Sequence, residues 1–154
     1  MTLLELTVAL VILALVVAVA APVLQGVTPR WQLRGAAHQV ENAVRLAQNA
    51  AATGNRGVQV MYDVPEGALW VRTRGSTVEL GRYRLPGGVQ FKRVRFATGI
   101  EVTADVAAAG VYSDGTLDAH VVILAGGAGY ARMAFDRLTG ALDYQEGTGD
   151  APGN

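Results

Sequence analysis

Residues 1–24 read MTLLELTVALVILALVVAVAAPVL, and no charged side chain occurs between Leu6 and Leu24. A helix that spans the hydrocarbon core of a bilayer needs about 20 residues of this kind. A cleaved secretory signal would begin with basic residues and have a shorter apolar run. A buried helix of this length would need a much larger protein than this chain of 154 residues. We therefore predict a single membrane-spanning helix at the start of the chain.

Glu5 stands at the edge of the apolar stretch, where a carboxylate is costly unless a partner or water satisfies it. The nearest basic side chain in the sequence is Arg30, so the closest positive charge is the α-amino group of Met1, on the same chain or on a neighbour. Two interpretations remain open. Parallel copies of this helix would pair Glu5 with a neighbouring amine and so fix their axial register, or Glu5 lies solvated among lipid headgroups.

Pro22 lies inside the apolar helix, where it removes one backbone hydrogen bond. We expect a kink or a local loosening of the helix at this residue.

A second helical pattern, over residues 30–53, is amphipathic. Apolar residues recur there every three to four positions, and the small ones among them form a seam that would allow a sheet to approach closely. These residues are Leu33, Ala36, Ala37, Val40, Ala43, Val44, Ala47, Ala50 and Ala51. Gly54 is expected to end the helix in a left-handed conformation. The chain therefore begins with one long helix, of which the first half is apolar and the second half amphipathic.

Residues 57–145 contain short strand-like segments separated by Gly, Pro, Asp and Asn turns. The expected strands cover residues 58–63, 68–73, 77–85, 89–96, 100–106, 110–112, 120–125, 130–135 and 141–144. Short strands that follow one long helix predict an α+β fold, with antiparallel β-sheets packed on the helix. Residues 147–154 are rich in Gly, Pro and Asp, and we expect a flexible tail there.

The segment Met1-Thr2-Leu3-Leu4-Glu5-Leu6 and the apolar run after it closely resemble the mature N-terminus of type IV pilins and type II secretion pseudopilins. Met1 departs from the pattern, since phenylalanine is usual at this position. The resemblance implies that a prepilin peptidase removes a short basic leader before Met1 and that Met1 is then methylated. It also implies that Glu5 guides subunit docking. A basic leader would restore the charge bias across the membrane, because Arg30 and Arg34 follow the span.

The later segments extend this resemblance over most of the chain. The order of residues 43–50, 85–89, 112–116 and 135–142 is similar to that in H-type minor pseudopilins of type II secretion and in related type IV minor pilins. The resemblance implies a pilin-like fold, with residues 1–28 as transmembrane and filament-core helix and residues 29–154 as extracytoplasmic globular domain. The chain would cross the bacterial inner membrane once, with this domain in the periplasm or outside the cell.

Three functional hypotheses follow. The first is a structural subunit of a type II secretion pseudopilus that supports protein export. The second is a type IV pilus pilin, minor or major, for adhesion, motility or DNA uptake. The third is a bitopic membrane protein that binds a ligand without polymerising. The first two imply other pilin or pseudopilin subunits, the inner-membrane assembly platform, the prepilin peptidase and exported cargo as partners.

Enzyme motifs do not occur in the sequence, and we expect no enzymatic activity, cofactor or metal. No Walker loop, zincin helix or dinucleotide fingerprint is found, and without cysteine no disulfide or thiolate metal site can form. Ser113, Asp114 and His120 are close in sequence, but Ser-Asp-Gly is ordinary turn chemistry. The pairs Asp114/Asp118 and Asp136/Asp143 lack the dense oxygen-ligand spacing of a calcium loop.

Basic residues cluster between positions 72 and 95, which hold seven of the thirteen Lys and Arg residues. The pairs Arg72/Arg74, Arg82/Arg84 and Arg93/Arg95 are each spaced by two, so each pair faces one side of a strand. If the strands adjoin, they form a basic stripe, and Arg82 and Arg84 become candidate nucleic-acid contacts. Gly81-Arg82-Tyr83-Arg84 is also similar to a short basic motif of DNA-uptake minor pilins. The alternative is a solvated face that pairs with acidic residues of the C-terminal half or of a neighbouring subunit.

Overall fold

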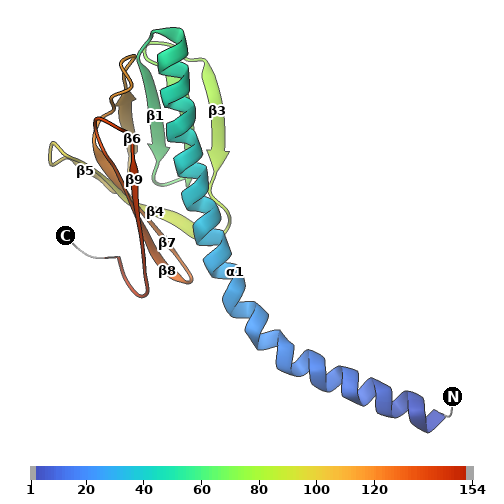
Figure 1. The fold of residues 1–154 in the computed structure, drawn as a ribbon. Helices are drawn as coiled ribbons and strands as arrows, with labels where there is room; N and C mark the ends of the chain where they lie inside the picture. The colour runs from blue at the N-terminus through green and yellow to red at the C-terminus, as the bar shows by residue number, and fades with distance from the viewer. Residues whose placement is uncertain (1–2, 152–154) are drawn as a thin grey trace.

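One helix, α1, runs without interruption from Leu3 to Gly54. The computed structural model describes residues 3–151, with backbone alone for residue 4 and residues 16–28. At a rise of about 1.5 Å per residue, these 52 residues extend over about 78 Å. Figure 1 shows α1 as a curved rod, with its blue first half projecting away from the sheets and its cyan-to-green second half packed against them.

The end of α1 differs by one residue from the sequence-based expectation. Gly54 is still helical, and the left-handed residue is Asn55, with a φ of 45°. Asn is one of the few residues besides Gly that adopts this conformation readily, because its short polar side chain can bond locally. Asn55 therefore takes the capping role that the sequence suggested for Gly54.

The strands form two antiparallel sheets. The four-stranded sheet has the order β3 (Glu79–Arg84), β2 (Ala68–Thr73), β1 (Val58–Asp63) and β6 (Val106–Val111). The five-stranded sheet has the order β5 (Glu101–Val102), β4 (Val89–Phe96), β7 (His120–Gly126), β8 (Gly129–Phe135) and β9 (Leu142–Gly147). The predicted α+β class with antiparallel sheets is confirmed.

Two sequence-based expectations about strands are wrong in part. The strand expected at residues 100–106 is divided between β5 and β6, which belong to different sheets. At the end of this break, the Asp105 carboxylate accepts a hydrogen bond from the Val106 amide at 2.7 Å. The strand expected to end at Tyr144 continues as β9 to Gly147, where we had expected the tail to begin. The last three residues, 152–154, lie outside the described part of the chain.

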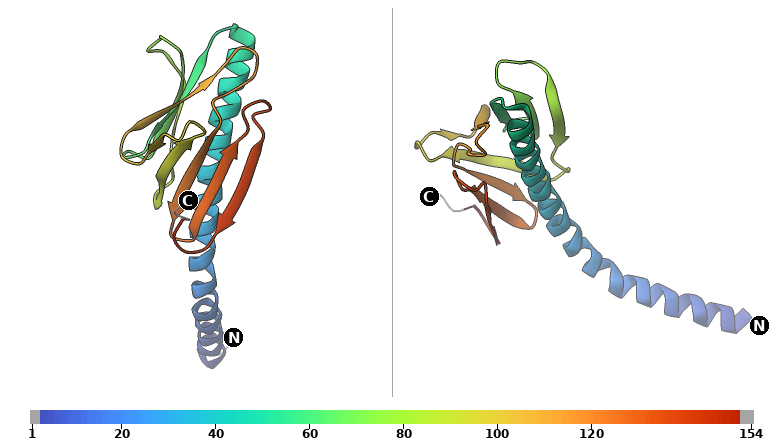
Figure 2. Two further views of the ribbon diagram at one scale, coloured as in Figure 1. Left: turned by 90° about the vertical axis from the view of Figure 1, so that its left-hand side faces the viewer. Right: turned by 45° about the horizontal axis from the view of Figure 1, so that its top comes forward.

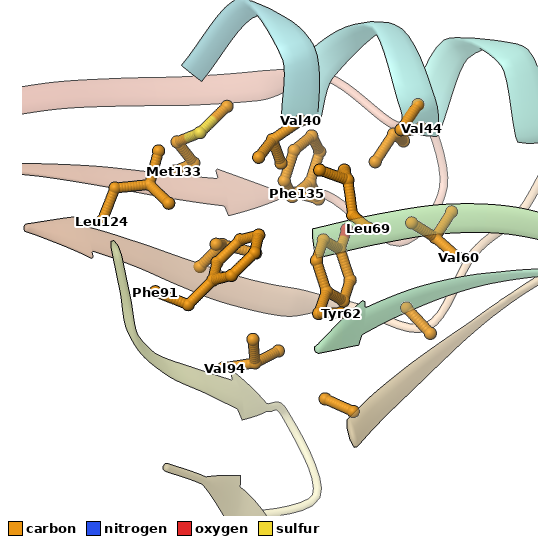
Figure 3. Packing of buried hydrophobic residues seen from close by; sticks show 14 of the residues in the cluster. Val40, Val44, Val60, Tyr62, Leu69, Phe91, Val94, Leu124, Met133 and Phe135 are labelled. Atoms are coloured by element: carbon orange, nitrogen blue, oxygen red, sulfur yellow. The ribbon is translucent and has the colours of Figure 1, made fainter. Parts of the chain in front are cut away.

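The hydrophobic core lies between the two sheets and the second half of α1. Val40 and Val44 of the helix face Leu69, Phe91 and other buried side chains of both sheets, as Figure 3 shows. Four helix alanines that are fully inaccessible to solvent form the predicted small-residue seam: Ala36, Ala43, Ala47 and Ala51. Because these side chains end at Cβ, the sheets can approach the helix backbone closely.

The first half of α1 projects away from the sheets (Figure 1). The two further views of Figure 2 also show it clear of both sheets. Within the residues whose side chains are described, no helical stretch is both long and apolar enough to cross a membrane. The span predicted for residues 6–24 falls partly outside those residues, because the side chains of 16–28 are not described.

Candidate functional site

The projecting end of α1 exposes an unusual density of large apolar side chains. Eight of them have exposed fractions between 51 and 83%: Leu3, Leu6, Val8, Leu10, Val11, Ile12, Leu13 and Leu15. Consecutive positions are exposed, so the apolar surface surrounds the helix and does not form one stripe. A helix that is apolar on all sides belongs inside a large protein, a membrane or an assembly. We call residues 3–15 of α1 the projecting apolar segment.

Glu5 lies in the first turn of α1 and is exposed. The helix dipole favours a negative charge at this end. Met1 and Thr2 lie outside the described residues, so the pairing of Glu5 with an amine stays a prediction. The kink at Pro22 also stays a prediction, since the side chain of Pro22 is outside the described part.

A bidentate ion pair joins strand β9 to α1. Arg34 donates from Nε to Glu146 Oε1 at 2.8 Å and from Nη2 to Oε2 at 3.2 Å. The Tyr144 hydroxyl donates to the same carboxylate. The Arg34 hydrogen bonds, followed by that of Tyr144, lower the pKa of Glu146, so the carboxylate stays charged. This contact ties the edge strand β9 to the second half of α1.

His120 is a polar residue buried in the core, with an exposed fraction of 3%. Its Nδ1 lies 2.6 Å from the backbone carbonyl of Asp118, and its Nε2 lies 2.9 Å from the Tyr62 hydroxyl. A carbonyl only accepts, so Nδ1 carries the proton and Nε2 accepts from Tyr62. Burial lowers the pKa of His120, and the ring is therefore neutral at physiological pH.

The Ser113, Asp114 and His120 group does not assemble into a catalytic triad. Both ring nitrogens of His120 are engaged by Tyr62 and the Asp118 carbonyl. The Asp114 carboxylate accepts hydrogen bonds from the amide and hydroxyl of Thr116, at 3.0 and 2.7 Å. Asp114 thus stabilises a turn, in agreement with the turn interpretation of Ser-Asp-Gly, and His120 belongs to the core.

The aspartate pairs considered for calcium have protein partners of their own. Asp118 accepts from the Gly110 amide and the Tyr112 hydroxyl. Asp136 caps the turn before β9 by accepting from Leu138 and Thr139. Among the side chains that are described, no three His, Asp or Glu residues gather closely enough to hold a metal ion.

The basic pairs do not form one continuous stripe, because β3 and β4 belong to different sheets. Arg82 lies over the Trp70 ring at 4.8 Å and pairs with Glu79 at 3.0 Å. Arg93 pairs with Glu101 at 3.3 Å. Intramolecular acidic and aromatic partners thus occupy part of this basic surface. A nucleic-acid contact at Arg82 and Arg84 stays a prediction.

Sequence reasoning did not identify the Tyr62–His120 and Arg34–Glu146 contacts. Arg34 and Glu146 are 112 positions apart, and neither residue belongs to a motif. Only the topology, which brings β9 beside the helix, makes them neighbours.

Comparisons with known proteins show which solved structures have a similar fold. No protein-family profile and no curated protein matches the sequence. The structure is similar to that of the minor pseudopilin EpsH from the type II secretion system of Vibrio cholerae, with a TM-score of 0.62 and 13% identity over 79% of this chain and 99% of that chain. It is also similar to the type IV minor pilin FimU of Pseudomonas aeruginosa, with a TM-score of 0.56 and 13% identity over 75% of this chain and 90% of that chain. The chain therefore has a type IV pilin-like fold.

Proposed function

We propose that the chain is a structural subunit of a pilin-type filament and assembles through the first half of α1. The observation that carries the proposal is the projecting apolar segment, which surrounds the helix with exposed Leu, Val and Ile side chains. Such a surface is not stable in water and requires another phase or other copies of itself around it. It projects from a domain with a pilin-like fold, which supports a filament as the assembled state.

Before assembly, residues 6–24 hold the subunit in the bacterial inner membrane as a single span, with the globular domain in the periplasm or outside. During assembly, the helix leaves the lipid and packs among the helices of neighbouring subunits. Lipid tails are as apolar as leucine side chains, so this transfer gains little from the hydrophobic effect. A motor at the inner-membrane assembly platform supplies the work of extraction.

Glu5 has a specific role in this proposal. Once the hydrophobic term nearly cancels, polar contacts inside the bundle decide which register is stable. We propose that Glu5 pairs with the α-amino group of Met1 on a neighbouring subunit. A prepilin peptidase generates this amine, and the methylated Met1 remains positively charged. The pair fixes the axial position of one subunit against the next.

Of the two filament classes, we propose the type II secretion pseudopilus, with other pseudopilins and exported cargo as partners. The support is the similarity to EpsH, which extends over 99% of that chain. A type IV pilus subunit is the second candidate, supported by the similarity to FimU. A bitopic protein that does not polymerise is the third, and it predicts no processing at Met1.

Intact-mass measurement and N-terminal sequencing of the native protein test the proposal. We expect a chain that begins at Met1 and carries one added methyl group. The same protein from a strain without prepilin peptidase is the control, and it should retain its leader and lack the methyl group. An unprocessed, unmethylated chain in the wild-type strain would contradict filament assembly and favour the third candidate.

A further inference from the structure

We propose that Trp31 is an interfacial membrane anchor, which holds the base of the globular domain at the lipid headgroups before assembly. The inference rests on the proposed membrane span of residues 6–24. Trp31 lies in α1 and is 66% exposed. The other tryptophan of the chain, Trp70, is partly covered within the four-stranded sheet by Arg82.

The distance along the helix places the Trp31 backbone just beyond the headgroup layer, and the lean of its side chain brings the indole into that layer. α1 is continuous from Leu24 to Trp31, and seven residues at about 1.5 Å each give a separation of about 10 Å. The headgroup layer on each side of the hydrocarbon core is about 5–8 Å thick. Long side chains of a helix lean toward its N-terminus, which brings the indole back toward the membrane. Tryptophan rings favour this layer because one edge is polar and the rest is apolar.

The neighbours of Trp31 fit the same position. Arg30 directly precedes Trp31 and is exposed, whereas Arg34 is already paired with Glu146. Guanidinium groups at the end of a span pair with lipid phosphates. Pro29, two residues before Trp31, lies close to Gly127 in the turn between β7 and β8. This turn lies near the end of the domain from which the helix projects (Figure 1), so a headgroup position for Trp31 brings the turn toward the membrane surface.

The rest of the exposed helix face argues against a protein partner at Trp31. One and two turns further along lie Arg34 and His38, and Arg45 follows, with side-chain exposures of 55, 76 and 69%. A second helix that packed on Trp31 and continued along this face would meet the guanidinium groups of Arg34 and Arg45. The membrane plane instead crosses the helix, so lipid can contact Trp31 without extending along the rest of this face.

Tryptophan fluorescence of the full chain in vesicles tests the inference. The vesicles contain phosphatidylcholine and phosphatidylglycerol, with bromine placed either near the glycerol end or near the methyl end of the acyl chains. Trp70→Phe leaves Trp31 as the sole reporter, and Trp31→Phe leaves Trp70 as the matched control. We expect the emission of Trp31 to fall further with the shallow bromine than with the deep one. Trp70 should keep its emission with both.

The outcomes separate the inference from the proposed function. If the chain floats with the vesicles but Trp31 is unquenched, or is quenched more by the deep bromine, the anchor is overturned and the span stands. An emission that shifts with the protein-to-lipid ratio and ignores bromine would also overturn it and indicate contact with a second copy. A chain that fails to float with the vesicles would overturn both the anchor and the membrane span.

Discussion

At the scale of single residues, Glu5 has two roles to distinguish. Thr2-Leu3-Leu4-Glu5 has the Ser/Thr-x-x-Glu spacing of a capping box, in which the glutamate side chain accepts from the backbone at the helix start. The proposed docking role instead needs a negative charge. Glutamine can fill a capping box but cannot form an ion pair, so the two roles respond differently to Glu5→Gln.

We predict that Glu5→Ala and Glu5→Gln both leave the protein in the membrane and both block its incorporation into filaments. The reason is that each removes the charge that pairs with a neighbouring amine. Incorporation is measured by immunoblotting sheared filaments against the membrane fraction. Full incorporation of Glu5→Gln, with loss in Glu5→Ala, would instead assign Glu5 to the capping box.

Tyr62 and His120 are a second residue-scale test, this time of the core. We predict that Tyr62→Phe lowers the free energy of unfolding by about 1–3 kcal/mol, because it leaves the buried Nε2 of His120 without its donor. Chemical denaturation of the full chain in mild detergent measures the loss. The control is the double variant Tyr62→Phe/His120→Phe. It should cost less than the two single losses added together, whereas strict additivity would show that the hydrogen bond contributes nothing.

The stability of the fold should depend on pH through His120. Burial holds the pKa of the folded His120 below the ordinary 6.5, so below pH 6.5 the unfolded chain binds more protons than the folded chain. Stability is therefore complete above pH 6.5 and falls as the pH drops toward the folded pKa, by up to about 1.4 kcal/mol per pH unit. Urea midpoints measured over this window should decrease in the wild type and change less in His120→Phe. Equal slopes would remove His120 as the cause.

At the scale of elements, the small-residue seam decides how closely the sheets approach α1. We predict that Ala43→Leu lowers the free energy of unfolding by about 1–3 kcal/mol, because Ala43 is fully buried and the extra atoms overpack the core. Ala52→Leu is the matched control on the same helix, since Ala52 is exposed, and its effect should stay within about 0.5 kcal/mol. Guanidinium unfolding measures both. A tolerated Ala43→Leu would mean that the seam is not tightly packed.

The sequence predicted several elements well and the pairing of strands poorly. The bounds of β1, β2 and β4 agree with the expected strands at residues 58–63, 68–73 and 89–96, because their turns carry strong Pro, Gly and Asp signals. No local pattern indicates that β6 leaves its neighbours in sequence and pairs with β1. That choice depends on contacts between distant residues, and the alanines of β6 carry little strand preference of their own.

The candidate site divides in the same way. The apolar run and Glu5 could be recognised from the sequence alone, because they lie in one continuous stretch of residues. The tie between Arg34 and Glu146 is not, because it exists only after β9 has been placed beside α1. Consecutive residues thus indicate the projecting apolar segment, whereas the contact between β9 and α1 depends on the topology.

At the scale of the whole molecule, the chain has two parts with opposite surfaces. The globular domain buries its apolar side chains around the second half of α1. The projecting apolar segment leaves its own exposed, so it contributes little to the stability of the domain and much to any assembly. A change in this segment should therefore affect insertion or polymerisation without unfolding the domain.

Leu15→Arg tests this separation. Leu15 is 62% exposed and lies near the middle of residues 6–24, where an arginine costs about 2.5–3.5 kcal/mol in membrane insertion. We predict that the variant is lost from the alkali-resistant membrane fraction and from filaments, while its domain unfolds at the same guanidinium midpoint as the wild type. His38→Arg adds a similar cation on the exposed polar face of the same helix and should insert normally. If Leu15→Arg lowered the unfolding midpoint, the segment would have to pack against the domain, and the two parts would not be independent.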